Sequence, residues 1–317
     1  MPPKPDLLVL ALLPDFLITP LQDDFTCHEG SRAAARAEVL AESSVRIRAL
    51  VGTGGTRYDE TLLRQLSALE IIAVIGVGYD GVPLEYCRQH GIHVTNTPDV
   101  LTEDVADIAL ALVLMTSRRL VEASRFLRAG SWEQGQFGLA TKPGGKRAGI
   151  LGLGRIGKAI ARRLEPMGME IGYHSRKAQE GCTLHFFPSL TELARWCDFL
   201  IVACPGGAAT RHTVDAEVLA ALGGEGTLIN IARGSIVDEA ALIEALRQHV
   251  IKAAGLDVFT DEPHVPAELM SLENVVLLPH VGSATHETRR AMAELVVENL
   301  RAHFAGKPLL TPVRELR

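Results

Sequence analysis

A glycine-rich stretch at residues 149–157 constrains the fold more than any other part of the chain. The apolar run Ala148–Leu151 predicts a buried parallel strand, and the residues after the stretch have the spacing of a helix. Between them, Gly152, Gly154 and Gly157 have the G-x-G-x-x-G spacing. The three glycines permit a tight turn, close approach of a pyrophosphate, and close packing of helix on strand. The stretch therefore predicts a dinucleotide bound at a helix N-terminus.

The residues after the next predicted strand, Met169–His174, indicate which dinucleotide binds. NAD enzymes usually carry Asp or Glu there to accept hydrogen bonds from the ribose hydroxyls, but this chain has Ser175, Arg176 and Lys177. The two cations can pair with a 2′-phosphate, and the serine hydroxyl can donate a hydrogen bond to it. We interpret the stretch as an NADP site, with NAD as the alternative cofactor. A solvated basic turn is the remaining possibility.

Composition excludes several classes of protein. The 317 residues are enough for two domains, and a net charge of −6 does not favour nucleic acid as a partner. The five cysteines include no C-x-x-C pair, which is typical of reduced thiols in the cytoplasm and not of a disulfide framework or a metal site. We read the apolar run Leu7–Leu13 as a first strand, and no run reaches the length of a membrane span.

Strand and helix patterns alternate along most of the chain, which predicts parallel sheets covered by helices. Glycine-rich loops at 52–55 and 76–78 follow two of the early strands. Their backbone N–H groups can bind an anion such as a carboxylate, or they can simply form tight turns. A long helix is predicted over Thr102–Leu127, and its apolar centre is expected to be buried, against a second subunit in one interpretation. The last long helix is predicted over Glu287–Phe304.

Three residues that follow predicted strands have the chemistry of carbonyl reduction: Arg233, Glu262 and His280. Hydride transfer to a carbonyl carbon places negative charge on the oxygen, so a cation and a proton donor are needed beside it. Arginine supplies a permanent cation, and histidine titrates near neutrality. A glutamate paired with the histidine would favour the imidazolium. Taken singly, each residue could instead be a surface ion pair, a structural histidine or a solvated acid.

The chain resembles the D-isomer-specific 2-hydroxyacid dehydrogenase family, and within it the glyoxylate/hydroxypyruvate reductase branch. The resemblance covers nearly the whole chain. It rests on these stretches: Gly152–Gly157, Ile229–Glu239, Gly255–Phe259 with Glu262 and Pro263, Pro279–Thr285, Gly76–Asp80 and Asn299–Leu309.

The resemblance implies an α/β fold of two Rossmann-like domains with doubly wound parallel sheets. The coenzyme domain, residues 99–284, would be inserted into a substrate domain made of residues 1–98 and 285–317. A helix and arm at 102–145 would form a homodimer, with Trp132 directed toward the neighbouring subunit's pocket.

The resemblance also implies roles for single residues. Arg233 would bind the substrate carboxylate and carbonyl, His280 would be the general acid/base, and Glu262 would be its partner. The backbone N–H groups of Val77 and Gly78 would bind the carboxylate, and Asp257 would contact the nicotinamide carboxamide. The other implied substrate contacts are Val51 and Gly52. The implied cofactor contacts are Gly152, Gly154, Arg155, Ile156, Gly157, Ser175, Arg176, Lys177, Cys204, Pro205, Thr210, Ile231, Ala232, Arg233, Asp257, His280 and Gly282.

Two loops depart from or refine this pattern. Residues 204–210 include two glycines where the family's loop is usually bulkier. The loop 51–56 is small and uncharged, which suits hydroxypyruvate, glyoxylate or 2-ketogluconate without excluding an aromatic 2-keto acid. The sequence therefore predicts an NADPH-preferring reductase that makes D-2-hydroxy acids. The alternatives are an NAD-dependent dehydrogenase working oxidatively, resembling phosphoglycerate dehydrogenase, and a non-catalytic protein that senses dinucleotides.

Overall fold

The computed structural model describes residues 3–316, so residues 1, 2 and 317 of the predicted ranges 1–98 and 285–317 lie outside the described part. The chain divides into two compact units, the first of residues 1–101 with 285–317 and the second of residues 102–284. Within the described part, no helix has both the length and the apolar character needed to cross a membrane.

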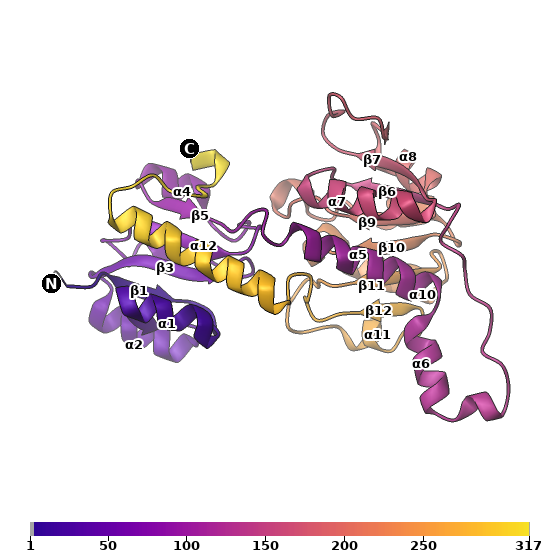
Figure 1. Ribbon diagram of the computed structural model, residues 1–317, viewed down its shortest axis with the longest axis horizontal. Helices are drawn as coiled ribbons and strands as arrows, with labels where there is room; N and C mark the ends of the chain where they lie inside the picture. The colour runs from indigo at the N-terminus through magenta and orange to yellow at the C-terminus, as the bar shows by residue number, and fades with distance from the viewer. Residues whose placement is uncertain (1–2, 317) are drawn as a thin grey trace. The chain divides into compact units, whose positions relative to one another are not determined.

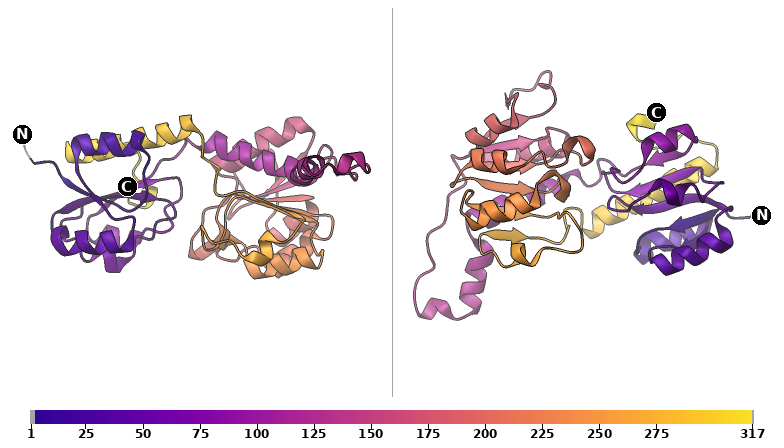
Figure 2. Two further views of the ribbon diagram at one scale, coloured as in Figure 1. Left: turned by 90° about the horizontal axis from the view of Figure 1, so that it is seen from below. Right: turned by 180° about the vertical axis from the view of Figure 1, so that it is seen from behind.

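The first unit is a parallel five-stranded sheet with helices on both faces (Figures 1 and 2). Its strand order is β2-β1-β3-β4-β5, from β1 (Asp6–Val9), β2 (Thr26–Glu29), β3 (Ile47–Thr53), β4 (Ile71–Ile75) and β5 (His93–Thr95). Helices α1 (Asp15–Asp24) and α12 (His286–Phe304) cover one face. The other face carries a shared apolar core with α2 (Ala33–Ser43), α3 (Glu60–Leu63) and α4 (Leu84–Gln89).

The second unit is a parallel seven-stranded sheet in the order β12-β11-β10-β9-β6-β7-β8. Its strands are β6 (Arg147–Leu151), β7 (Glu170–His174), β8 (His185–Phe186), β9 (Phe199–Val202), β10 (Thr227–Asn230), β11 (Ala253–Leu256) and β12 (Val275–Leu277). Helices α5 (Thr102–Ser117) and α7 (Arg155–Leu164) pack on one face. The other face carries α8 (Leu190–Trp196), α9 (Ala216–Leu222), α10 (Glu239–Arg247) and the short α11 (Ala267–Met270). Both sheets are parallel α/β structures, as the alternating pattern predicts.

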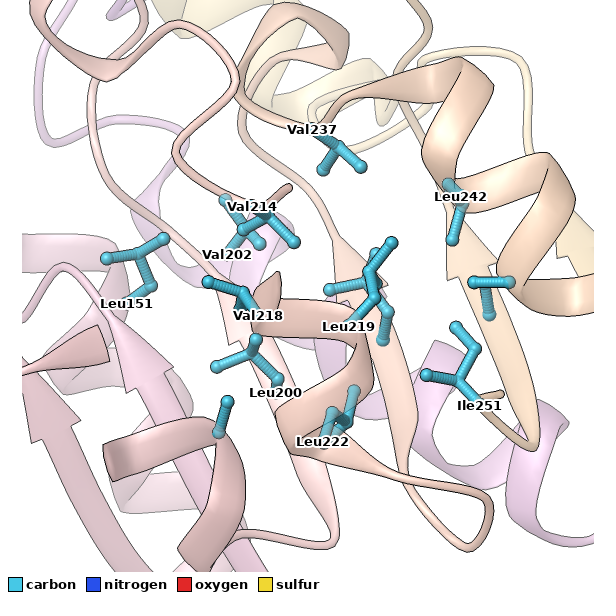
Figure 3. Close-up of a cluster of buried hydrophobic side chains, with 14 of the residues drawn as sticks. Leu151, Leu200, Val202, Val214, Val218, Leu219, Leu222, Val237, Leu242 and Ile251 are labelled. Atoms are coloured by element: carbon cyan, nitrogen blue, oxygen red, sulfur yellow. The ribbon is translucent and has the colours of Figure 1, made fainter. Parts of the chain in front are cut away.

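Apolar side chains fill the space between the second sheet and its helices (Figure 3). Leu200 on β9 lies in one cluster with Leu219 on α9 and Leu242 on α10. Full burial of a leucine side chain is worth about 1.5–3 kcal/mol, so this layer holds the strand ends in place. The site described below rests on that rigid support.

One predicted helix is wrong in its extent. The structure replaces the single helix over Thr102–Leu127 by α5, which ends at Ser117, and α6 (Leu120–Arg128). Arg119 separates them in the left-handed region at φ 53°, and its guanidinium bonds Glu122 and lies over the Phe137 ring. Helical periodicity continues through this break, so it could not be seen in the sequence. Helix α6 and the short helix η1 (Ser131–Glu133) project away from the sheet of their unit (Figure 1).

Candidate active site

The glycine-rich loop follows β6 at the point where the strand order reverses. Gly152 has φ +98°, and a Cβ there would lie 2.6 Å from Cα of Cys204, in the loop after β9. A Cβ on Gly157 would lie 2.2 Å from the Gly152 carbonyl oxygen. A Cβ on Gly154, in contrast, would meet nothing within 4 Å in the described part of the chain. Two glycines are therefore required by the turn and its packing, and the third leaves open space for a ligand.

The glycine-rich loop leads into the N-terminus of α7, which favours an anion. Gly154 is its N-cap, and no side chain within the described residues caps it. Arg155 and Ile156 form the first turn of this helix. Uncapped N–H groups and the positive end of the helix dipole attract phosphate. The loop fits a nicotinamide dinucleotide, which when bound supplies or accepts the hydride.

The loop after β7 carries the predicted 2′-phosphate contacts. Ser175 Oγ donates a hydrogen bond to the Lys177 carbonyl oxygen at 2.7 Å. The side chains of Arg176 and Lys177 are exposed and, among residues 3–316, have neither a hydrogen-bond nor an ion-pair partner. No carboxylate of the described residues neutralises them, so both charges are available to a phosphate.

The turn after β10 positions Arg233. The buried side chain of Asn230 spans it, because its Nδ2 donates to the Arg233 carbonyl at 2.9 Å and its Oδ1 accepts from the Ala232 N–H at 3.1 Å. Gly234 packs against the backbone of Phe259, where a Cβ would lie 2.0 Å from the carbonyl carbon. This close approach brings the Arg233 turn beside the loop after β11. The role of Asn230 was not predicted, because in the sequence the residue is only an amide at the end of an apolar strand.

Glu262 and His280 are joined as the sequence analysis anticipated. Glu262 Oε2 lies 2.6 Å from His280 Nδ1, and its Oε1 accepts from the Phe259 N–H at 2.9 Å. Burial raises the pKa of Glu262, but the bonds to His280 and Phe259 and the charges of His280 and Arg233 outweigh it, so the pKa is lowered. An ionised carboxylate only accepts, so Nδ1 is the donor. The His280 side chain is 46% exposed, and Nε2 is the ring nitrogen that Glu262 leaves for a proton transfer.

Asp257, at the end of β11, anchors the turn that carries His280. Its two carboxylate oxygens accept the N–H groups of Val281 and Gly282, each at 2.8 Å. Burial raises the pKa of Asp257 against the lowering effect of these bonds. His280 itself has φ 53°, a left-handed conformation that is uncommon for a non-glycine residue. The buried carboxylate therefore fixes the backbone on which the histidine stands. The predicted contact of Asp257 with the nicotinamide carboxamide stays a prediction.

The loop after β9 contains the remaining predicted cofactor contacts of the second unit. Thr210 Oγ1 donates to the Pro205 carbonyl at 2.7 Å and so closes the loop. Cys204 lies against Gly152, and burial raises the pKa of its thiol to about 11. Ile231 and Ala232 belong to the Arg233 turn on the next strand. All these residues lie at the carboxyl edge of one sheet, where α/β folds bind ligands.

The predicted substrate contacts Val51, Gly52, Val77 and Gly78 lie in the first unit, at or beyond the carboxyl ends of β3 and β4. A Cβ on Gly52 would lie 2.5 Å from the Tyr58 hydroxyl oxygen, so a larger residue there would displace that buried side chain. Asn96 Nδ2 donates to the Val77 carbonyl at 2.8 Å and holds the second loop. Among the described residues, no group accepts from the N–H of Val77 or Gly78. Both donors are thus available to an anion.

The residues of the second unit suffice for acid-assisted carbonyl chemistry. Arg233 carries a permanent positive charge, and Nε2 is the ring nitrogen of His280 that Glu262 does not engage. The bond from Nδ1 to Glu262 holds the ring in one tautomer. Arg233, Glu262 and His280 follow the adjacent strands β10, β11 and β12, so the sheet itself brings them together.

Known proteins are similar to this chain over most of its length. Residues 110–282 match the model of the D-isomer specific 2-hydroxyacid dehydrogenase, NAD binding domain. The chain is 49% identical to glyoxylate/hydroxypyruvate reductase A HPR2 of Arabidopsis thaliana, over 96% of this chain and 98% of that protein. It is 51% identical to hydroxyphenylpyruvate reductase of Plectranthus scutellarioides, over 88% and 89%. A crystal structure of NADPH-dependent glyoxylate/hydroxypyruvate reductase from Sinorhizobium meliloti with NADP and malonate matches at TM-score 0.94 and 45% identity, covering 99% and 98%.

Proposed function

The chain belongs to the D-isomer-specific 2-hydroxyacid dehydrogenase family, whose members are NAD(P)-dependent oxidoreductases, and on that premise we propose an NADPH-preferring reductase of small 2-keto acids. Its substrates would be hydroxypyruvate and glyoxylate, with 2-ketogluconate a further candidate, and its products D-2-hydroxy acids. The observation that carries the proposal is the 2.6 Å contact between Glu262 and His280, which lies within the electrostatic reach of Arg233.

The proposed chemistry assigns one task to each of these side chains. Arg233 binds the substrate carboxylate and carbonyl and stabilises the charge that develops on the carbonyl oxygen. His280 donates the Nε2 proton to that oxygen, while Glu262 stabilises the imidazolium until the proton leaves. The unengaged N–H groups of Val77 and Gly78 hold the carboxylate. In the oxidative direction the same proton moves from the substrate hydroxyl to Nε2 of His280.

The preference for NADPH is supported by the loop after β7. Arg176 and Lys177 have no partner within the described part of the chain, and they stand where an NAD enzyme would carry an acid. The Sinorhizobium meliloti relative was crystallised with NADP. We expect Arg176→Ala to weaken NADPH binding about tenfold or more and to leave NADH binding nearly unchanged, since a charge-assisted bond is lost only with the phosphate.

Two alternatives make different demands on these residues. An NAD-dependent enzyme that works oxidatively would carry an acid in place of the pair Arg176 and Lys177. A dinucleotide sensor needs no proton donor, and the paired Glu262 and His280 would then be without purpose. Both alternatives are therefore less favoured than the reductase.

Steady-state turnover tests the proposal. NADPH and NADH would be compared with hydroxypyruvate, glyoxylate, pyruvate, 2-ketogluconate and hydroxyphenylpyruvate. The last is included because one relative is a hydroxyphenylpyruvate reductase. Faster turnover of the small acids with NADPH is the expected result. A clear preference for NADH, or for the aromatic acid, would overturn the cofactor or the substrate part of the proposal.

We further propose a homodimer and a cytoplasmic location. Helix α6 contributes no buried residue to its own unit, and Leu127 and Trp132 are exposed. Large exposed apolar side chains that gather on a projecting segment are typical of an interface. Trp132 would then reach the neighbouring subunit's pocket. All five cysteines are free, which agrees with a reducing compartment.

A further inference from the structure

A glutamine outside the predicted site joins the two loops that would hold the cofactor. The side chain of Gln179 crosses from the loop after β7 to the glycine-rich loop, where its Nε2 donates a hydrogen bond to the Leu153 carbonyl oxygen. Leu153 stands between Gly152 and Gly154, at the turn that would receive the pyrophosphate. Gln179 itself comes two residues after Lys177.

The backbone of Gln179 is held as well. Its N–H donates to the hydroxyl oxygen of Tyr173 at 2.9 Å. Tyr173 lies on β7 and is only 1% exposed, so this anchor belongs to the rigid sheet. The segment 175–178 is thus attached at both ends, by β7 before it and by Gln179 after it. Its cationic side chains lie between these two attachments.

We propose that Gln179 is a positioning residue that gives the enzyme its selectivity for the 2′-phosphate. This inference rests on the proposed preference for NADPH and adds the device that sets it. The hydrogen bond from Gln179 to the Leu153 carbonyl fixes the distance between the pyrophosphate loop and the pair Arg176 and Lys177. A 2′-phosphate and a pyrophosphate belong to one ligand, so both loops must hold one spacing to bind it at once.

Loss of this hydrogen bond should affect the two loops unequally. The glycine-rich turn keeps two other supports. One is the hydrogen bond from the Gly152 N–H to the His174 carbonyl oxygen at 2.9 Å, and the other is the close packing of Gly157. The exposed loop 175–178 keeps the link at His174, at its start, and loses the link at Gln179, at its end. Contacts to the 2′-phosphate should therefore weaken while contacts to the rest of the nucleotide persist.

The test measures binding, separately from turnover. Titration calorimetry would give Kd for adenosine 2′,5′-bisphosphate and for adenosine 5′-monophosphate with wild type, Gln179→Ala and Gln179→Glu. The glutamate keeps the length of the side chain but cannot donate to the Leu153 carbonyl. Gln65→Ala is the matched control, because Gln65 Nε2 donates to a backbone carbonyl, that of Thr61, at 2.9 Å in the first unit.

We expect both Gln179 variants to bind the bisphosphate about three- to tenfold more weakly, the range for one lost hydrogen bond, with monophosphate binding changed less than about twofold. The KM for NADPH should rise by the same factor while kcat is retained. Equal weakening of both nucleotides, or no change in either, would overturn the inference. A wild type that binds the two nucleotides equally would instead overturn the proposed NADPH preference on which the inference rests.

Discussion

At the scale of single residues, Asp257 and Glu262 are two carboxylates on one loop with opposite environments. Asp257 is 1% exposed and spends both oxygens on backbone N–H groups, and burial raises its pKa. For Glu262, the bonds to His280 and to the Phe259 N–H, together with nearby positive charge, outweigh burial and lower the pKa. Environments that shift the pKa values of two neighbouring acids in opposite directions usually indicate different roles. Asp257 fixes the backbone of the turn at Val281 and Gly282, whereas Glu262 favours its ionised form beside His280.

The lowered pKa of Glu262 makes part of the stability depend on pH. A depressed acid contributes stability that is present above its unfolded pKa, about 4.3, and is lost as pH falls through the folded value. We expect Glu262→Gln to unfold at lower urea concentration than wild type at pH 7, and the difference to shrink toward pH 3. Glu244→Gln, at an exposed ion pair with Arg247, serves as control. A difference in urea midpoint between wild type and Glu262→Gln that is the same at pH 7 and pH 3 would contradict this expectation.

Asp257→Asn should disturb the histidine turn. An amide has one acceptor oxygen, so its NH₂ group would face one of the N–H donors of Val281 and Gly282. We expect unfolding free energy to fall by about 1–3 kcal/mol and kcat to fall about tenfold or more. Asp215→Asn is the comparison, because Asp215 accepts a single N–H, from Val218 at 3.0 Å, as an N-cap where Asn serves equally. A kcat unchanged in Asp257→Asn would show that the turn needs no carboxylate.

At the scale of elements, the start of α7 separates the structural from the functional use of glycine. We expect Gly157→Ala to lower the unfolding free energy by about 1–3 kcal/mol, since the Cβ would lie 2.2 Å from the Gly152 carbonyl oxygen. Gly154→Ala meets no atom within 4 Å in residues 3–316, so it should keep stability and weaken NADPH binding. Thermal denaturation and fluorescence titration distinguish the two. Equal loss of stability in both variants would contradict the argument.

The elements differ in how far the sequence could predict them. Strand β7 (Glu170–His174) and helix α12 (His286–Phe304) lie within one residue of their predicted bounds, because continuous or periodic apolar residues define them. Strand β2 (Thr26–Glu29) was not predicted, since an edge strand of polar residues lacks that pattern. Helix α1 (Asp15–Asp24) was missed because it contains Pro20, a residue that usually ends a helix.

The site shows a similar division. The pairing of Glu262 with His280 could be predicted, because reduction requires a proton donor and a partner for it, and each residue follows an apolar strand. Asn230 and Gln179 could not, because their amides bond backbone atoms and no reaction step demands a glutamine or an asparagine. Asp257 was assigned to the cofactor, while its bonds to Val281 and Gly282 lie 24 and 25 residues along the chain. Contacts of this kind become visible only in the folded chain.

At the scale of the whole molecule, the projecting segment of α6 and η1 bears on assembly. Leu127 is 55% and Trp132 is 67% exposed, and α6 buries no residue in its own unit. We expect wild type to sediment as a dimer and Leu127→Glu to shift it toward monomer, because a buried charge at an interface is costly. Leu12→Glu, at an exposed leucine of the first unit, is the control. A monomeric wild type, or a dimer indifferent to Leu127→Glu, would contradict the proposed interface.

The most direct test of catalysis by this family member is His280→Gln, measured for both turnover and binding. We expect kcat for hydroxypyruvate reduction to fall about 10²–10⁴-fold, the usual contribution of a general acid. Kd for NADPH should stay nearly unchanged, because the loops after β6 and β7, which we propose to hold the cofactor, are intact. A kcat within about threefold of wild type would contradict the role of His280 as the proton donor.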